Sequence, residues 1–346
     1  MSDQPDNLRP DAVTEFWTWW GTAKHRIAAA IANQSVRNEV DDISAAVKRL
    51  HPGFAWELGP GRSAQHSLTV SPEGDLGLRR LTAIWLASAP PRDQTWEYFA
   101  SRQASPVLSL DIGGSSLSPE EFAVAHQYDE SRERFNVWLY HPRFHKLPPQ
   151  AVSQALFLTL DQSLGEDEVE RWISSLQAVL SRPPNAVSLN EFVAAVEAAR
   201  MRATGEQYTL GQGRSRDGGP VLVNVNMALK QINHLDHVYH LIAVIGLGEP
   251  DGNGMPGNVE AESLNQMEDA LTSALGENAV ALGRVTWGGR RELYFFVRDT
   301  AAAEAATTAW AQQAAPWGTS HVVRYDPKWW AAREGVYTAM APGTAN

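Results

Sequence analysis

The chain has 346 residues, of which 43% are apolar and 20% are charged, and its formal net charge is −11 at pH 7. This length exceeds the usual size of one hydrophobic core, so we expect two domains, and the composition is typical of a globular protein rather than a disordered one. The acidic balance argues against nucleic acid as a partner, because that affinity depends on Lys and Arg side chains that neutralise phosphates. It favours basic partners over membranes.

The sequence contains no cysteine, which excludes disulfides, thiolate zinc sites and thiol nucleophiles. The first residues, MSDQPDNLRPDAV, are polar and partly acidic, unlike the basic start and apolar run of a signal peptide. No run approaches the roughly 18 uncharged apolar residues that a membrane-spanning helix needs. We therefore expect no membrane association and, by default, a cytoplasmic location.

The first 200 residues predict a mixture of helices and short strands. Residues 11–50 carry apolar side chains at helical spacing, and segments rich in Pro and Gly separate the elements that follow. The later predicted helices cover 76–87, 150–180 and 189–200, and the predicted strands cover 54–58, 66–70, 95–102, 107–112 and 135–140. Gly165 is a potential break in the longest of these helices.

Residues 201–219 hold five glycines and few large apolar side chains, which is typical of a boundary between domains. We therefore expect an N-terminal mixed α+β domain over residues 1–203 and a second domain over 204–346.

The second domain contains a hairpin with a strong sequence signal. Two strand-like runs, 280–287 and 290–298, are joined by Gly288-Gly289, a pair that supplies the positive φ angles of a tight two-residue turn. The neighbouring predicted elements are strands 220–226, 237–245 and 321–325, a helix 263–275 with Ser263 and Gln266 as a capping box, and an Ala-rich helix 300–315. This β-α-β-β-α-β order predicts a ferredoxin-like domain, with a four-stranded antiparallel sheet and two helices on one face.

The C-terminal residues also resemble a known family. The segments GRVT (283–286), GRR (289–291), LYFFV (293–297) and DPKW (326–329), together with Asp299, are similar to the bacterial domain of unknown function family 695. They resemble more distantly the ferredoxin-like regulators of ribonuclease E activity, type B. The resemblance covers about residues 237–330 and departs from the family pattern at Phe296, where a tyrosine is usual, and at Ala332, where an aromatic residue is expected.

These resemblances imply a fold and no reaction, and the distant regulators imply at most binding to a protein partner. A weaker resemblance links the N-terminal half to the uncharacterised region that precedes this domain in some bacterial proteins. It rests on Ala89-Pro90, Trp96-Glu97, His141-Pro142 and Leu164-Gly165-Glu166.

The sequence HLDHVYH holds the only histidine cluster of the chain. A zinc site needs two or three imidazoles on one ion, at Zn–N distances of about 2.0–2.1 Å. On a strand, His234, Asp236 and His240 would share one face while His237 points away. A metal-assisted hydrolase that uses His234, Asp236 and His240 is therefore the alternative to a non-enzymatic protein, although the H-E-x-x-H and G-x-S-x-G motifs are absent.

Two other segments carry groups that can bind ligands or take part in catalysis. The loop 246–258 lacks the Lys and Ser/Thr of a phosphate-binding loop, so we expect no cofactor. The acidic run 166–170 starts a second helix, where each carboxylate near the N-terminus contributes about 0.3–1 kcal/mol against the helix dipole. A hydrolase with paired carboxylates needs a second acid in the same cleft with a raised pKa, and the sequence does not identify one.

Four arginines, Arg284, Arg290, Arg291 and Arg298, give the hairpin a positive stripe. They could dock an acidic partner or the N-terminal half, or pair within their own domain with residues such as Glu292, Asp299 and Asp326.

Our leading hypothesis is a non-enzymatic interaction or regulatory protein that binds a protein partner through the C-terminal domain or the groove between domains. The proposed binding residues are Arg284, Arg291, Tyr294 and Trp329, because Arg, Tyr and Trp are the usual anchors of interfaces. The oligomeric state is left open, and the 13 tryptophans are compatible with self-association as a third class, although core packing explains them more simply.

Overall fold

The computed structural model describes residues 8–106, 109–314 and 317–332. It contains both helices and sheets, which confirms the α+β class. The chain divides into two compact units: unit 1 comprises Met1–Tyr128 and Arg134–Met201, and unit 2 comprises Asp129–Glu133 and Arg202–Asn346. None of the helices described is both long enough and apolar enough to cross a membrane.

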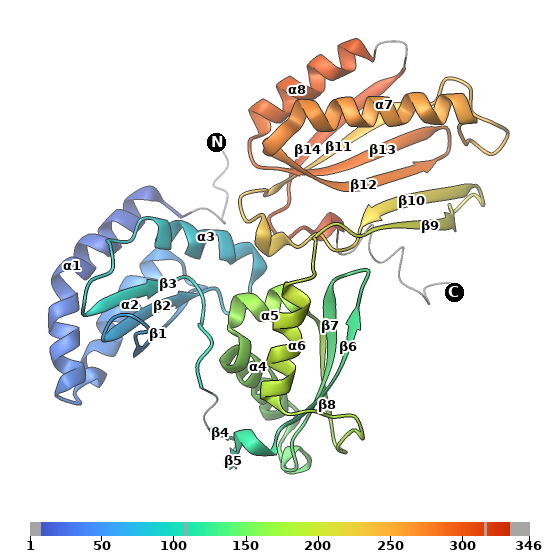
Figure 1. The fold of residues 1–346 in the computed structure, drawn as a ribbon. Coiled ribbons are helices and arrows are strands. Elements are labelled where there is room, and N and C mark those ends of the chain that lie inside the picture. The colour runs from blue at the N-terminus through green and yellow to red at the C-terminus, as the bar shows by residue number, and fades with distance from the viewer. Residues whose placement is uncertain (1–7, 107–108, 315–316, 333–346) are drawn as a thin grey trace. The chain divides into compact units, whose positions relative to one another are not determined.

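Unit 1 begins with three helices that share one core with a three-stranded sheet (Figure 1). Strand β2 lies in the middle, antiparallel to β1 and parallel to β3. The first elements are α1 (Pro10–Ala32), α2 (Val40–Leu50), β1 (Ala55–Pro60), β2 (His66–Ser71), α3 (Leu76–Ala87) and β3 (Trp96–Phe99). Tryptophans fill this core: Trp20, Trp85 and Trp96 are buried, and the Trp20 indole N–H donates to the Tyr98 hydroxyl at 3.0 Å. Core packing therefore accounts for these three tryptophans.

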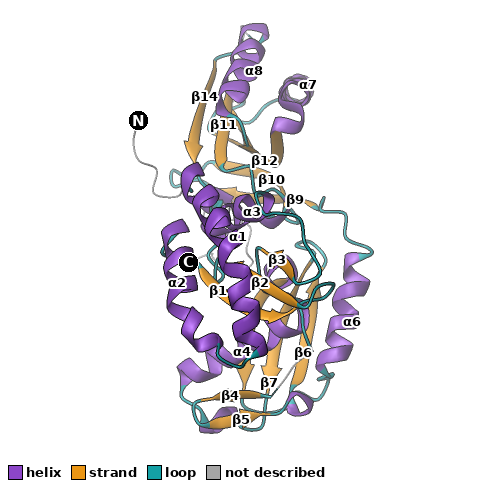
Figure 2. Cartoon of the chain, turned by 90° about the vertical axis from the view of Figure 1, so that its left-hand side faces the viewer, coloured by secondary structure: helices purple, strands orange, loops and turns teal. Residues whose placement is uncertain are grey.

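The second part of unit 1 combines a sheet of order β6-β7-β8 with three helices (Figure 1), and Figure 2 shows its helices α4 and α6 and its strands β6 and β7 from another side. Its elements are β4 (Leu110–Ile112), β5 (Ser115–Leu117), β6 (Ala123–Asp129), β7 (Arg134–Tyr140), α4 (Pro149–Leu164), α5 (Glu166–Trp172), β8 (Ile173–Val179) and α6 (Leu189–Arg200).

The helical region predicted over 150–180 is confirmed as far as Trp172, with the expected break at Gly165 and a second helix after it, but the prediction for its last residues is wrong. The chain breaks at Gly165, which has a φ of 90°, and residues 173–179 form a strand that pairs in parallel with β7. The predicted stripe of apolar residues therefore ends at Trp172, because pairing with a strand distant in the sequence overrides the local helical pattern.

Unit 2 contains a six-stranded sheet of order β14-β11-β13-β12-β10-β9, in which all neighbours are antiparallel. Its strands are β9 (Tyr208–Arg214), β10 (Pro220–Asn226), β11 (Tyr239–Gly246), β12 (Ala279–Trp287), β13 (Arg290–Val297) and β14 (Thr319–Tyr325). The predicted hairpin is confirmed, with φ angles of 53° at Gly288 and 77° at Gly289. The sheet is wider than the four strands predicted, because β9 and β10 form a further hairpin at its edge.

Helices α7 (Asn258–Leu275) and α8 (Thr300–Gln313) pack against one face of this sheet. Leu264, Leu271 and Trp310 contribute to the core that they share with Leu241 and Phe295. The predicted start of α7 at residue 263 is wrong, since the helix begins five residues earlier. Ser263 lies inside the helix, and its hydroxyl donates to the Val259 carbonyl at 3.2 Å instead of capping the first turn.

Candidate functional site

Two of the four predicted binding residues, Arg284 and Arg291, point toward α7. The Arg284 guanidinium lies 2.7 Å from a carboxylate oxygen of Glu268. Arg291 is buried and donates to Asn265 at 2.8 Å and to Thr286 at 3.2 Å. Both arginines are therefore paired within unit 2, mainly with Glu268, whereas the expected partner Glu292 lies 2.8 Å from Arg290.

The other two, Tyr294 and Trp329, belong to the opposite face of the sheet. Trp329 is buried, its indole N–H donates to the His237 carbonyl at 2.7 Å, and its ring stacks on Phe296 at 4.0 Å. The Tyr294 hydroxyl donates to Glu292 at 2.5 Å. The four residues are thus divided between two faces and do not converge on one site.

The histidine cluster is part of the same aromatic packing. The strand expected from residue 237 starts at Tyr239, so the segment before it is irregular. The His234 ring stacks on Trp329, and the His240 ring stacks on both Tyr294 and Phe296, where burial lowers the pKa of His240 to about 4. In the part of the chain that the structure describes, no group of three His, Asp or Glu side chains could hold a metal. The set His234, Asp236 and His240 therefore gains no support as a metal site.

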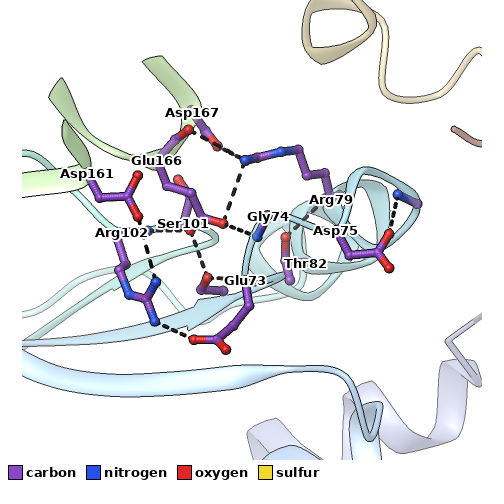
Figure 3. Close-up of polar contacts among 12 residues, drawn as sticks. Glu73, Gly74, Asp75, Arg79, Thr82, Ser101, Arg102, Asp161, Glu166 and Asp167 are labelled. Atoms are coloured by element: carbon purple, nitrogen blue, oxygen red, sulfur yellow. Dashed lines mark hydrogen bonds and ion pairs between the residues drawn. The ribbon is translucent and has the colours of Figure 1, made fainter. Parts of the chain in front are cut away.

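A pocket of about 570 Å³ in unit 1 is the candidate functional site (Figure 3). Four segments bring charged residues to it: the connection between β2 and α3, the start of α3, the chain after β3, and the junction of α4 with α5. Its lining consists of Glu73, Gly74, Arg79, Arg102, Gln154, Phe157, Leu158, Asp161, Glu166, Val169 and Glu170.

Glu166 is the fixed centre of this network, as Figure 3 shows. Its buried carboxylate accepts hydrogen bonds from the Ser71 hydroxyl at 2.7 Å, the Gly74 amide at 2.9 Å and the Arg102 amide at 3.2 Å. The break at Gly165 ends α4 and places Glu166 in the first turn of α5. Three hydrogen bonds from three different segments therefore fix the position of this carboxylate beside Asp161.

The two arginines of the pocket already have acidic partners. Arg79 is buried on α3, where it lies 2.5 Å from Asp167 and 3.6 Å from Glu166. Arg102 lies 2.5 Å from Glu73 and 3.5 Å from Glu57. These ion pairs largely neutralise both arginines, so little positive charge is left to compensate the other acids of the pocket.

Asp161 is the acid whose charge is least compensated. Its side chain, on α4, is 13% exposed, and its ion pair with Arg102 is long, at 3.8 Å. Burial, followed by the negative charge of Glu166, raises the pKa of Asp161 to about 6. A buried carboxyl with a strongly raised pKa in a pocket is typical of functional sites.

An apolar wall lies beside this carboxyl. Phe157, one turn before Asp161 on α4, is 57% exposed, and Leu158 and Val169 also line the pocket. The arrangement can therefore accept a positively charged group that carries an apolar portion.

The sequence contained two usable signals for this site, the acidic run 166–170 and a helix that carries arginines. The helix LGLRRLTAIWLA, residues 76–87, is mostly apolar and its only charged residues are two arginines, and a charged side chain on a buried helix face requires an acidic partner. Asp161 could not be singled out, because its raised pKa arises from burial by segments distant in the sequence.

Comparison with known proteins concerns unit 2 rather than this pocket. No curated protein matches the chain. Residues 214–333, which include β10 to β14, α7 and α8, match the model of a family described as a family of unknown function (DUF695), so the predicted resemblance to that family is confirmed for this part of the chain.

Proposed function

We propose that the chain is a binding protein and that the pocket around Asp161 and Glu166 takes up a Lys or Arg side chain of a protein partner. The observation that carries the proposal is the Asp161 carboxyl, which is buried beside Glu166 with a single long ion pair to Arg102. A cation placed there would supply the charge compensation that the fold does not supply.

The apolar wall supports the same ligand. A Lys or Arg side chain carries a hydrocarbon stem that packs on apolar surfaces while its charged end binds a carboxylate. Phe157, Leu158 and Val169 offer that surface next to Asp161. The net charge of the whole chain, −11, adds a long-range attraction for a basic partner.

Binding is favoured over covalent catalysis by the composition of the pocket. A carboxyl with a pKa near 6 is suited to general acid–base chemistry. The residues described along the pocket, however, include no Ser, Thr, His or Lys, and the carboxylate beside Asp161, that of Glu166, is fixed by three hydrogen bonds rather than free to attack a substrate. The neighbouring Ser71 hydroxyl is engaged with Glu166. This supports the non-enzymatic hypothesis but moves the binding site from the C-terminal arginines to unit 1.

We also propose that unit 2 has a ferredoxin-like fold, to which the β9–β10 hairpin is an addition. The spatial order β14-β11-β13-β12, together with α7 after β11 and α8 after β13, supports this assignment. The relationship to the ribonuclease E regulators, the bacterial origin and the cytoplasmic location stay predictions from the sequence.

Isothermal titration with short peptides tests the proposed ligand. The probes are acetyl-Leu-Arg-Leu-amide, its Lys counterpart, and a neutral counterpart in which citrulline replaces arginine. We expect the charged peptides to bind with a Kd of about 0.1–1 mM, the range for one ion pair with apolar contacts, and the citrulline peptide at least about tenfold more weakly. Binding should strengthen as the pH rises through 6, because the anion of Asp161 is the binding form.

Two variants make the test specific. Asp161→Asn removes the charge with little change in shape and should abolish binding, whereas Asp41→Asn removes an exposed acid on α2 and should leave binding unchanged. Equal affinity for the arginine and citrulline peptides, or retained binding by Asp161→Asn, would refute the proposal.

A further inference from the structure

Strand β9 forms one edge of the sheet of unit 2. Its residues 208–214 pair with β10, and among the described residues no strand pairs with its other side. Figure 1 shows β9 as the outermost strand beyond β10. Its outward backbone groups are therefore available to another strand.

The register identifies which residues face outward. The Ser215 amide donates to the Gly219 carbonyl at 2.8 Å, and the Met227 amide donates to the Gln207 carbonyl at 2.9 Å. Hydrogen-bonded and non-hydrogen-bonded pairs alternate along an antiparallel ladder, so the odd-numbered residues of β9 bond to β10. The residues that present N–H and C=O groups outward are consequently Tyr208, Leu210, Gln212 and Arg214.

This edge lacks the features that normally protect an exposed strand. Edge strands are usually blunted by proline, bulges or inward-pointing charges. β9 has none of these within its regular register with β10, and its single charged residue, Arg214, is the last of the strand. It also carries two large exposed apolar side chains, Leu210 at 69% and Tyr208 at 54% exposure. The opposite edge strand, β14, includes Arg324 and His321.

We propose that β9 pairs with β9 of a second copy of the chain, antiparallel about a twofold axis at Gly211. The sequence YTLGQGR is complementary to itself in this register. Each Tyr208 lies opposite Arg214 of the other copy, where an arginine on an aromatic ring is favourable, and no like charges face each other. Leu210 lies opposite Gln212.

The register also suits the centre of the interface. Gly211 meets its counterpart as a non-hydrogen-bonded pair, in which Cα atoms approach to about 4.5 Å, and two glycines allow this without side-chain conflict. The axis is perpendicular to the sheet, so the two six-stranded sheets join into one and α7 of each copy lies on the same side. On that side, Leu210 and Tyr208 of each copy then lie beside Gln212 and Arg214 of the other.

Analytical ultracentrifugation of the full chain, from about 1 to 100 µM, tests this assembly over the micromolar affinities typical of modest interfaces. We expect a monomer–dimer equilibrium that Leu210→Lys weakens at least about tenfold, because the two lysines are diagonal neighbours across the axis and repel each other. Gln212→Pro should have the same effect, since it removes an outward N–H and leaves the bonds to β10 intact. Val322→Lys, on the edge strand β14, is the matched control and should leave the dimer unchanged.

Circular dichroism melting of each variant separates loss of pairing from loss of folding. A chain that is monomeric at about 100 µM overturns the proposal, because an interface of this size should associate in that range. So does a dimer that persists in both folded β9 variants. Dissociation caused by Val322→Lys would assign the interface to β14 and overturn the proposal as well.

Discussion

Replacing Asp161 by asparagine is expected to stabilise the fold at pH 8, although it removes the centre of the proposed binding site. Burial and Glu166 raise the pKa of Asp161 from 3.8 to about 6. At one pKa unit per about 1.4 kcal/mol, ionised Asp161 costs the folded state about 3 kcal/mol. The substitution also removes the 3.8 Å ion pair with Arg102, but Arg102 keeps Glu73 at 2.5 Å, so we expect a net gain of about 1–3 kcal/mol.

The pH dependence gives the sign of this effect. The folded state holds the proton of Asp161 more tightly than the unfolded state does. Binding of this proton therefore stabilises the folded state fully below pH 3.8, and this stabilisation is lost as the pH rises to about 6. Asparagine does not titrate. The gain in unfolding free energy that Asp161→Asn gives over the natural chain should consequently be full at pH 8 and fall below about 1 kcal/mol at pH 4.

Urea unfolding of the natural chain and the variant at both pH values measures this difference. Asp41→Asn, an exposed acid on α2, is the control and should change the unfolding free energy by less than about 0.5 kcal/mol. If Asp161→Asn is less stable than the natural chain at pH 8, with an unchanged dependence on urea, the carboxylate is adequately paired. The reasoning about the pocket would then be wrong.

Three further substitutions separate binding residues from core residues. Phe157→Ala should weaken the binding of the arginine peptide at least about threefold in titration, yet change stability by less than about 0.5 kcal/mol, because Phe157 is exposed. Glu166→Gln should destabilise the chain by about 1–3 kcal/mol in urea unfolding, since it disturbs the hydrogen bonds from Ser71, Gly74 and Arg102, whereas exposed Glu197→Gln should have almost no effect. Trp329→Ala should cost about 3–5 kcal/mol, and Trp330→Ala, at an exposed position, less than about 1 kcal/mol.

The sequence predicted well those elements that are determined by residues close together in the chain. The helices at 76–87 and 189–200 have the predicted bounds, and the Gly288-Gly289 turn joins its two strands as expected. The failures occur where the partner is distant in the sequence. Residues 173–179 form a strand because β7, nearly 40 residues earlier, is available for pairing. The glycines that suggested a linker at 201–219 are tolerated in β9 because that strand lies at an edge.

The proposed C-terminal binding residues illustrate a limit of composition-based reasoning about sites. Arg, Tyr and Trp anchor interfaces because they combine large contact areas with hydrogen bonds. The same properties suit them to the interior, where Trp329 donates to the His237 carbonyl and Arg291 to Asn265. Residue type alone therefore does not distinguish an anchor that binds a partner from one that holds the fold.

The effect of a buried residue on the stability of the fold distinguishes a binding residue from a structural one, which residue type does not. The presence of a buried group that stabilises the fold, such as Trp329, is accounted for by that stabilisation. A buried group that destabilises it, as ionised Asp161 does at neutral pH, requires another explanation, because a stabilising substitution by asparagine would be readily available. Binding of a cation is the explanation that the chemistry of the pocket favours, since the ligand would offset the cost of burying this carboxylate beside Glu166.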